Sequence, residues 1–144
     1  MKSLLDIVKD KLGTDASPQD NAPDRLACAE TISTILREYL AQHNIDFPVI
    51  LGTYQLWREF QKRTDLFVRV YDTKAGTLEI APTGTNSRPD LLPNGHVWVF
   101  LNETEACSNS SKTGTFEQNY DRVSIRKLFH YYGGYNLYLY DLKI

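Results

Sequence analysis

The chain has 144 residues, of which 42% are hydrophobic and 24% are charged, and its formal net charge at pH 7 is −2. This length and composition are typical of one soluble globular domain with a single core. The small negative charge argues against a general nucleic-acid partner, and no apolar run approaches the roughly 18 residues of a membrane span. The N-terminal stretch MKSLLDIVKDKLG lacks the apolar core of about 7–15 residues that a secretory signal needs, so we expect a chain made in the cytoplasm.

The first half of the sequence has the apolar spacing of helices. The apolar residues within 4–12 predict a short helix that ends at Gly13, and the stretch 13–24, rich in Pro, Asp and Ser, predicts a loop. Asp24 can cap the next helix, whose apolar positions recur at helical spacing and predict one buried stripe. This stripe consists of Cys28, Ile32, Ile35, Leu36 and Tyr39. A third helix is predicted from Gly52 onward.

The second half of the sequence changes to short stretches rich in β-branched and aromatic residues, which predict strands. The predicted strands are residues 67–71, 77–81, 96–101 and 135–142. Residues 124–134 predict a short helix closed by glycine. Helices followed by a mostly antiparallel sheet indicate an α+β fold. We divide the chain into an N-terminal helix and loop (1–20) and a single main domain (21–144).

Cys28 is a candidate nucleophile because it lies in the first turn of its predicted helix. A free cysteine has a pKa of about 8.5, and the positive end of a helix dipole or a neighbouring imidazole lowers that value. The alternative is a small buried residue of the apolar stripe, which is the commoner role of a helical cysteine. Cys107 has no predicted helix terminus near it and is interpreted as core or strand edge, with a disulfide to Cys28 as a further alternative.

Of the three histidines, His96 is the best candidate for the base that would activate Cys28. It opens the predicted strand 96–101, whereas His43 lies at a helix end and His130 is interpreted as packing or surface. A polar group normally orients such an imidazole. If residues 107–110 form the neighbouring antiparallel strand, Asn109 is the first choice for this role. Ser108 is the alternative, since a shift of one residue in the strand register exchanges the two faces.

Some residues near this pair could contact a substrate. Tyr54 could border a cleft, and Arg88 or Asp90, in the long loop before His96, could bind a charged peptide. Ser108 is a further candidate for substrate contact. The clustered C-terminal tyrosines could form an aromatic groove or simply one side of a half-buried strand. The cysteines and histidines lack metal-ligand spacing, so neither a metal nor a cofactor is expected. No helix face carries paired carboxylates, which gives a glycosidase little support.

Four stretches, taken in their order along the chain, resemble the NlpC/P60 and CHAP group of papain-like cysteine peptidases and amidases, and the small phage and bacterial versions most closely. These stretches are LACAETISTIL, GTLEIAPTGT, NGHVWVFLNE and CSNSSKTGTFEQNY. Together with the C-terminal helix and strand, the resemblance covers roughly residues 20–144. It differs at three places. Many relatives have a small residue where this chain has Trp98, and many have Gly-Asp where this chain has Gly76 and Thr77. The third catalytic residue is often His or Glu, and the only such residues after His96 at a comparable spacing are Glu103 and Glu105, in a predicted turn.

The resemblance implies a papain-like core in which a Cys helix packs on an antiparallel sheet. It implies hydrolysis of amide bonds in the stem peptides of peptidoglycan, with Cys28 as nucleophile, His96 as base and Asn109 as orienting residue. Attack by the thiolate would give an acyl-enzyme, which water would release. The backbone N–H of Cys28 could contribute to an oxyanion hole, because helix N-terminal amides are unpaired.

Two other functions are compatible with the same scaffold. One is a catalytically inactive binding module, for which Cys28 would be buried and unreactive. The other is an acyltransferase that uses the same Cys–His pair with an amine in place of water. A wall-cutting enzyme without a secretory signal would reach the wall through a phage lysis pore or a dedicated secretion machine. An antibacterial toxin exported by a secretion machine would have an immunity protein as its partner.

Overall fold

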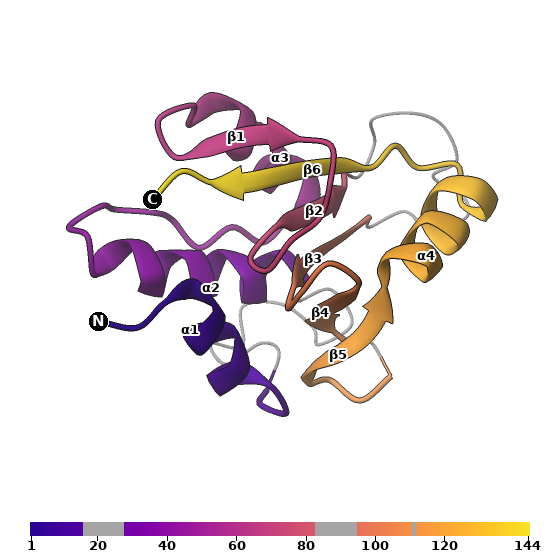
Figure 1. Cartoon of the computed structure of the whole chain (residues 1–144), viewed down its shortest axis with the longest axis horizontal. Coiled ribbons are helices and arrows are strands. Elements are labelled where there is room, and N and C mark those ends of the chain that lie inside the picture. Colours follow the sequence, from indigo (N-terminus) through magenta and orange to yellow (C-terminus); the bar gives the residue numbers. More distant parts are fainter. Residues whose placement is uncertain (16–27, 83–94, 111) are drawn as a thin grey trace.

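The computed structural model describes residues 1–15, 28–82, 95–110 and 112–144 and shows an α+β fold in which helices flank an antiparallel sheet (Figure 1). The helices are α1 (Leu4–Lys11), α2 (Cys28–Ala41), α3 (Thr53–Lys62) and α4 (Arg122–Ile125), which continues directly into the π-helix η2 (Arg126–Tyr132). The strands are β1 (Phe67–Val70), β2 (Leu78–Ala81), β3 (His96–Phe100), β4 (Glu105–Asn109), β5 (Phe116–Asp121) and β6 (Tyr138–Leu142). Every pair of neighbouring strands in this sheet is antiparallel.

The strands of the described sheet follow the order β1-β6-β2-β3-β4-β5, so the C-terminal strand lies between β1 and β2. The register pairs Ile80 with Val97 across β2 and β3, and Val99 with Cys107 across β3 and β4. Because side chains alternate along a strand, this register fixes which residues face each side of the sheet. Val97, Val99 and Cys107 share one face of the sheet. The residues that alternate with them along β3 and β4 face the other side.

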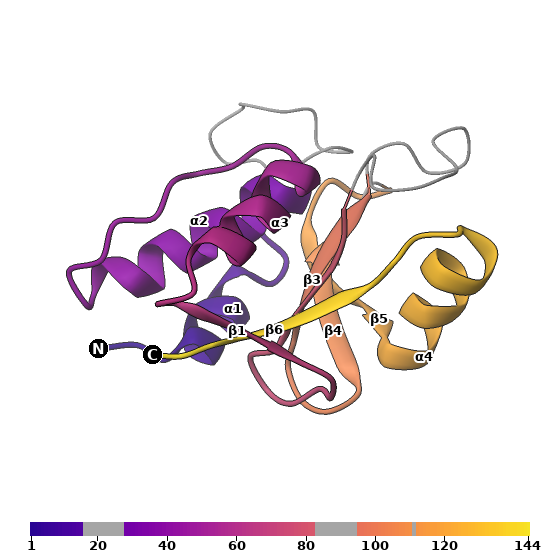
Figure 2. The same cartoon turned by 90° about the horizontal axis from the view of Figure 1, so that it is seen from above.

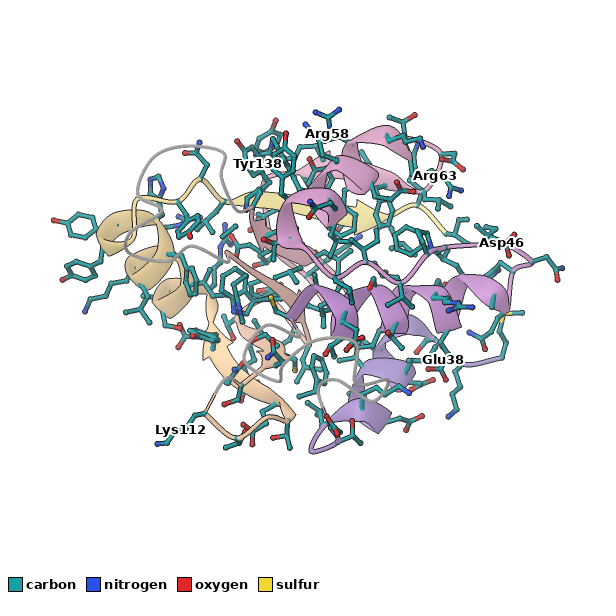
Figure 3. All side chains as sticks on the ribbon, turned by 180° about the vertical axis from the view of Figure 1, so that it is seen from behind. Glu38, Asp46, Arg58, Arg63, Lys112 and Tyr138 are labelled. Atoms are coloured by element: carbon teal, nitrogen blue, oxygen red, sulfur yellow. The ribbon has the colours of Figure 1, made fainter. Side chains whose placement is uncertain are left out.

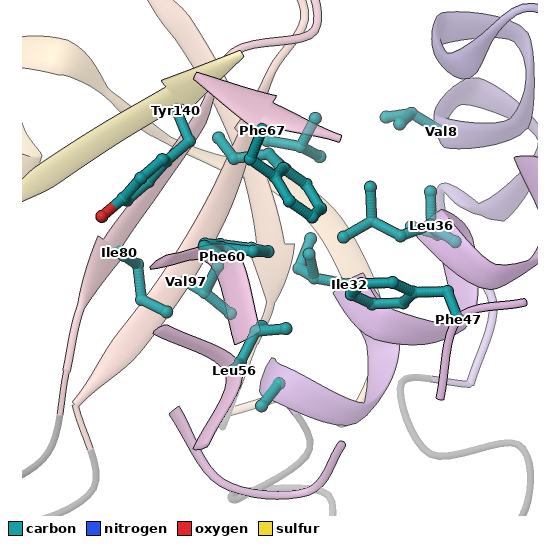
Figure 4. Packing of buried hydrophobic residues seen from close by; sticks show 14 of the residues in the cluster. Val8, Ile32, Leu36, Phe47, Leu56, Phe60, Phe67, Ile80, Val97 and Tyr140 are labelled. Atoms are coloured by element: carbon teal, nitrogen blue, oxygen red, sulfur yellow. The ribbon is translucent and has the colours of Figure 1, made fainter. Parts of the chain in front are cut away.

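Each face of the sheet has its own hydrophobic cluster. In Figure 2, α1, α2 and α3 lie on one side of the strands, and α4 with η2 lies on the other. The larger cluster, shown in Figure 4, joins the three N-terminal helices to the sheet through residues such as Leu36, Phe60 and Val97. The smaller cluster packs η2 against the opposite face and includes Trp98 and Phe129. His96, at the start of β3, therefore belongs to a strand with a core on both sides.

The expected α+β fold is confirmed, and most predicted elements are present with ends that differ by a few residues. β4 lies where the neighbouring strand of His96 was expected. β5 was not predicted, because its sequence FEQNYD has few apolar residues and lacks a regular apolar–polar alternation. It lies at the edge of the sheet, where such an alternation is not needed. The predicted C-terminal helix is mostly a π-helix rather than an α-helix. The proposed cap Asp24 lies outside the described residues.

The N-terminal helix α1 packs as part of the same unit as α2. Ser3 and Asp6 form a capping box, in which the Ser3 hydroxyl accepts from the backbone N–H of Asp6. Ile7 and Val8 are buried in the larger cluster. The backbone N–H of Lys2 also donates to the side chain of Gln42 at 2.7 Å. The apolar face of this helix is thus used in the fold of the domain.

Many charged side chains lie at the periphery of the molecule. Figure 3 labels five that point outward, namely Glu38, Asp46, Arg58, Arg63 and Lys112. Some form surface ion pairs, such as Lys11 with Glu38 at 3.2 Å, which contribute little to stability individually. None of the helices in the described segments has both the length and the apolar character needed to cross a membrane.

Candidate functional site

Cys28 is the first residue of α2, and its side chain is buried, with 4% of the residue exposed. Burial raises the pKa of its thiol to about 11, above the ordinary value of 9.0. Backbone hydrogen bonds from Ala29, Cys28 and Val97 act in the opposite direction and lower the pKa. Desolvation therefore outweighs the helix N-terminus, and the resting thiol is protonated at neutral pH.

The contact with Val97 places the Cys28 thiol beside the strand that His96 begins. β3 and β4 pair at Val99–Cys107 and at Phe100–Ala106. We call the start of β3, ahead of these pairs, the fork. The backbone N–H of Val97 reaches the Cys28 sulfur at this fork, one residue along the chain from His96.

His96 is held by a chain of two side-chain hydrogen bonds. Its Nε2 lies 2.9 Å from the Oγ of Ser108, and this hydroxyl donates to the Oδ1 of Asn119 at 2.9 Å. A serine hydroxyl has one proton, and that proton is used on Asn119. Nε2 must therefore carry the hydrogen and donate it to Ser108. The neutral ring is left with its lone pair on Nδ1, which has no hydrogen-bond partner among the described residues.

Aromatic rings enclose the His96 imidazole on the η2 side of the sheet. Phe129 stacks on it with ring centroids 5.6 Å apart, Trp98 meets it edge-on at 4.7 Å, and Tyr120 lies at 5.9 Å. This burial lowers the pKa of His96 to about 4, from an ordinary value of 6.5. The imidazole is consequently neutral at physiological pH, and its position is fixed by packing as well as by Ser108.

The two candidate groups are close along the backbone but are not bonded. No hydrogen bond joins the thiol of Cys28 to the imidazole of His96 in the part of the chain that the structure describes. Because burial raises the pKa of the thiol to about 11 and lowers the pKa of the imidazole to about 4, both groups are neutral near pH 7 in the resting protein.

The hydrogen-bond partner of His96 is Ser108 and not Asn109, which was the first choice from the sequence. Val99 pairs with Cys107, so Ser108 falls on the same face as Trp98 and His96. Asn109 is buried and falls on the opposite face, toward α2. The register of β4 therefore assigns the orienting role to the residue that was also considered for substrate contact.

Tyr54, His43 and His130 pack against or form hydrogen bonds with residues other than Cys28 and His96. The half-buried ring of Tyr54 packs against Trp57, and His43 packs against Tyr39 with centroids 5.1 Å apart. Nδ1 of His130 donates to the carbonyl of Tyr135 at 2.7 Å. Cys28 and Cys107 are both free, so the disulfide between them is not formed. Arg88 and Asp90 lie outside the described residues.

Sequence reasoning missed two residues that define the surroundings of His96. Asn119 lies on β5, which was not predicted, although it belongs to the stretch CSNSSKTGTFEQNY that carries the family resemblance. Phe129 lies on η2, far from His96 in sequence. The hairpin around Gly114 pairs Ser108 with Glu117, and Asn119 lies two residues further along β5.

The hydrogen-bond chain predicts which tautomer His96 adopts. We expect ¹⁵N NMR of the imidazole near pH 7 to show the hydrogen on Nε2 and the lone pair on Nδ1. Ser108→Ala removes the acceptor, so the variant should show a mixture of the two tautomers. Asn119→Asp keeps an acceptor for the serine proton and should retain the wild-type tautomer. A ring protonated on Nδ1 in the wild type would contradict the assigned direction of both hydrogen bonds.

Among the described residues, no group of three or more His, Cys, Asp or Glu side chains is arranged to hold a metal ion. The arrangement can supply two groups. One is the neutral, oriented imidazole of His96, and the other is the thiol of Cys28, which contacts the backbone next to His96. Compared with known proteins, the sequence matches no family model and no curated protein.

Proposed function

We propose that this protein is a cysteine hydrolase of amide bonds that acts on the stem peptides of peptidoglycan, with Cys28 as nucleophile and His96 as general base. One observation carries the proposal: the Ser108–Asn119 hydrogen-bond chain leaves the lone pair of His96 on Nδ1, and Val97, the next residue along the chain, contacts the Cys28 thiol. The resemblance to NlpC/P60 and CHAP enzymes supports a papain-like arrangement and supplies the substrate class.

The chemistry starts from the neutral pair. As the Cys28 sulfur attacks the carbonyl carbon of the peptide, its proton moves to Nδ1 of His96, and a tetrahedral oxyanion forms. His96 then donates this proton to the leaving amine, the C–N bond breaks, and a thioester remains on Cys28. Water attacks the thioester with His96 accepting its proton, which finally returns to the thiol. In this proposal, backbone N–H groups near Cys28 would stabilise the oxyanion.

Catalysis therefore requires Nδ1 of His96 to come within hydrogen-bond reach of the Cys28 sulfur when substrate is bound. Catalytic hydrogen bonds commonly tighten only in the substrate complex. In this proposal, Nε2 of His96 stays on Ser108 during the approach, so the orienting contact is retained. Transfer of the proton during attack, rather than before it, avoids the cost of forming the ion pair first.

The direct test is digestion of purified peptidoglycan by the full chain. Cleavage of a stem peptide exposes one new amino group and one new carboxylate for each bond broken. Labelling of the free amino groups, followed by mass spectrometry of the soluble fragments, would identify the bond. We expect new amino groups that increase with time and with enzyme concentration. Sacculi and isolated stem peptides that both stay intact would rule out this substrate class.

A non-catalytic binding module is the second candidate, and the burial of Cys28 favours it. A thiol with 4% of its residue exposed and a pKa near 11 is unreactive in the resting protein. Alkylation of the native protein by iodoacetamide across a range of pH, read out at Cys28 by mass spectrometry, separates the two. Stem peptides should accelerate alkylation or compete with it if they reach Cys28. A thiol that stays inert in their presence, with no digestion, identifies a binding module.

A further inference from the structure

A cavity lies on the η2 side of the sheet, at the strands farthest from β5. Its volume is about 340 Å³, and it is bounded by β1, β2 and β6 on one side and by η2 on the other. Val70, Leu139 and Glu79 lie in one cross-strand row on the floor, since Leu139 pairs with both of the others. The row is apolar except for the carboxyl of Glu79. The cavity is distinct from the Cys28 fork.

Glu79 is an unusual residue for this floor. It is only 4% exposed, and its Oε1 has no hydrogen-bond partner among the described residues. Its neighbours in the row are Leu139 on one side and Trp98 on the other. A buried carboxyl oxygen without a donor costs free energy, and such groups are normally satisfied by a protein group, an ordered water or a ligand. The floor of this cavity therefore has room for a hydrogen-bond donor.

The η2 wall of the cavity supplies the opposite charge. Arg126 lines the cavity and is close enough to lower the pKa of Glu79, yet it forms no ion pair with any described residue. His130 also lines it, with Nδ1 engaged by Tyr135, which leaves Nε2 available. Burial still raises the pKa of Glu79 to about 7, so Arg126 does not neutralise it by direct contact. A negative and a positive group thus share one cavity without meeting.

We propose that this cavity binds a small zwitterion of amino-acid type, with its ammonium group on Glu79, its carboxylate on Arg126 and an apolar side chain against Val70 and Leu139. Such a ligand satisfies the carboxyl oxygen of Glu79 and gives the guanidinium a planar, bidentate partner. The cavity volume suits a single amino acid or the end of a short peptide. This site does not depend on catalysis by Cys28.

Three probes of similar shape test the proposal by isothermal titration calorimetry on the full chain. Leucine carries both charges, 4-methylpentanoate lacks the ammonium group, and 3-methylbutylamine lacks the carboxylate. Because a hydrogen bond to a charged group contributes severalfold in affinity, leucine should bind at least about 10-fold more tightly than either analogue. Equal binding of all three, or no binding of leucine at millimolar concentration, would overturn the proposal.

Two variants locate the binding in this cavity. Glu79→Gln and Arg126→Gln should each weaken leucine binding at least about 10-fold, and Arg126→Gln should also remove the preference for leucine over 3-methylbutylamine. Arg58→Gln, at an exposed position on α3 outside the cavity, is the matched control and should bind leucine as the wild type does. Unfolding curves show whether each variant is folded. Leucine binding that neither cavity variant changes would place the site elsewhere and refute this assignment.

Discussion

Cys28→Ala is expected to lower the rate of stem-peptide hydrolysis by at least about 1,000-fold, because alanine cannot form the acyl-enzyme that the proposed mechanism requires. His96→Ala should cause a loss of similar size, since the thiol then has no acceptor for its proton. The losses should not add in the double variant, because the two residues act as a unit. The initial rate of amino-group release from peptidoglycan gives the hydrolysis rate of each of the three variants.

Cys107→Ala is the matched control for this experiment. Both cysteines are free, buried and part of the larger cluster, so both substitutions should cost a similar free energy of unfolding, on the order of 1 kcal/mol. Burial raises the pKa of Cys107 to about 12, and no helix begins near it. Cys107→Ala should therefore hydrolyse peptidoglycan within a few-fold of the wild type. Equal losses in both cysteine variants would indicate a packing defect and would refute Cys28 as nucleophile.

The periodicity of the sequence was sufficient for the elements that bury a regular apolar pattern. The stripe predicted for α2 is mostly buried in the structure, and β3 lies where the β-branched and aromatic residues of 96–101 predicted a strand. β5 was missed because an edge strand needs no apolar alternation, as Glu117, Gln118 and Asn119 illustrate. The π-helical turn of η2 has no periodic signature of its own and depends on how Phe129 packs against the sheet.

The candidate site depends on which face each strand residue occupies, and the sequence left this open. Asn109 and Ser108 differ by one residue, yet only Ser108 shares a face with His96. Trp98 was recognised as a departure from the family resemblance, and its position now has a physical meaning. The indole lies two residues after His96 on the same face of β3, and it packs with the imidazole and Phe129 on the η2 side.

The pKa values of Glu79 and His96 predict opposite effects of pH on stability. The pKa of Glu79 rises from 4.5 to about 7 in the folded protein, so its contribution is complete below pH 4.5 and is lost as the pH rises through 7. The pKa of His96 falls from 6.5 to about 4, so its contribution is complete above pH 6.5 and is lost as the pH falls through 4. Each amounts to about 3 kcal/mol. In the wild type the two largely cancel between these limits.

Glu79→Gln should remove one of these effects and reveal the other. Near pH 4 the variant and the wild type should have the same free energy of unfolding, because the wild-type carboxyl is already neutral. Near pH 8 the variant should be more stable by up to about 3 kcal/mol, since the wild type then holds a buried carboxylate. Urea unfolding at both pH values measures the difference. Glu103→Gln, at an exposed turn position, should change stability by less than about 0.5 kcal/mol at either pH.

The same measurement connects the buried carboxyl to the cavity around it. An ammonium group bound beside Glu79 stabilises the carboxylate form, so saturating leucine should raise the stability of the wild type near pH 8. Leucine should raise the stability of Glu79→Gln much less, so the difference in free energy of unfolding between the two proteins should become smaller. Arg122 and Arg126 already act on this carboxyl from α4 and η2, yet burial outweighs them. A pH-independent gap between variant and wild type would mean that the ionisation of Glu79 is not coupled to folding.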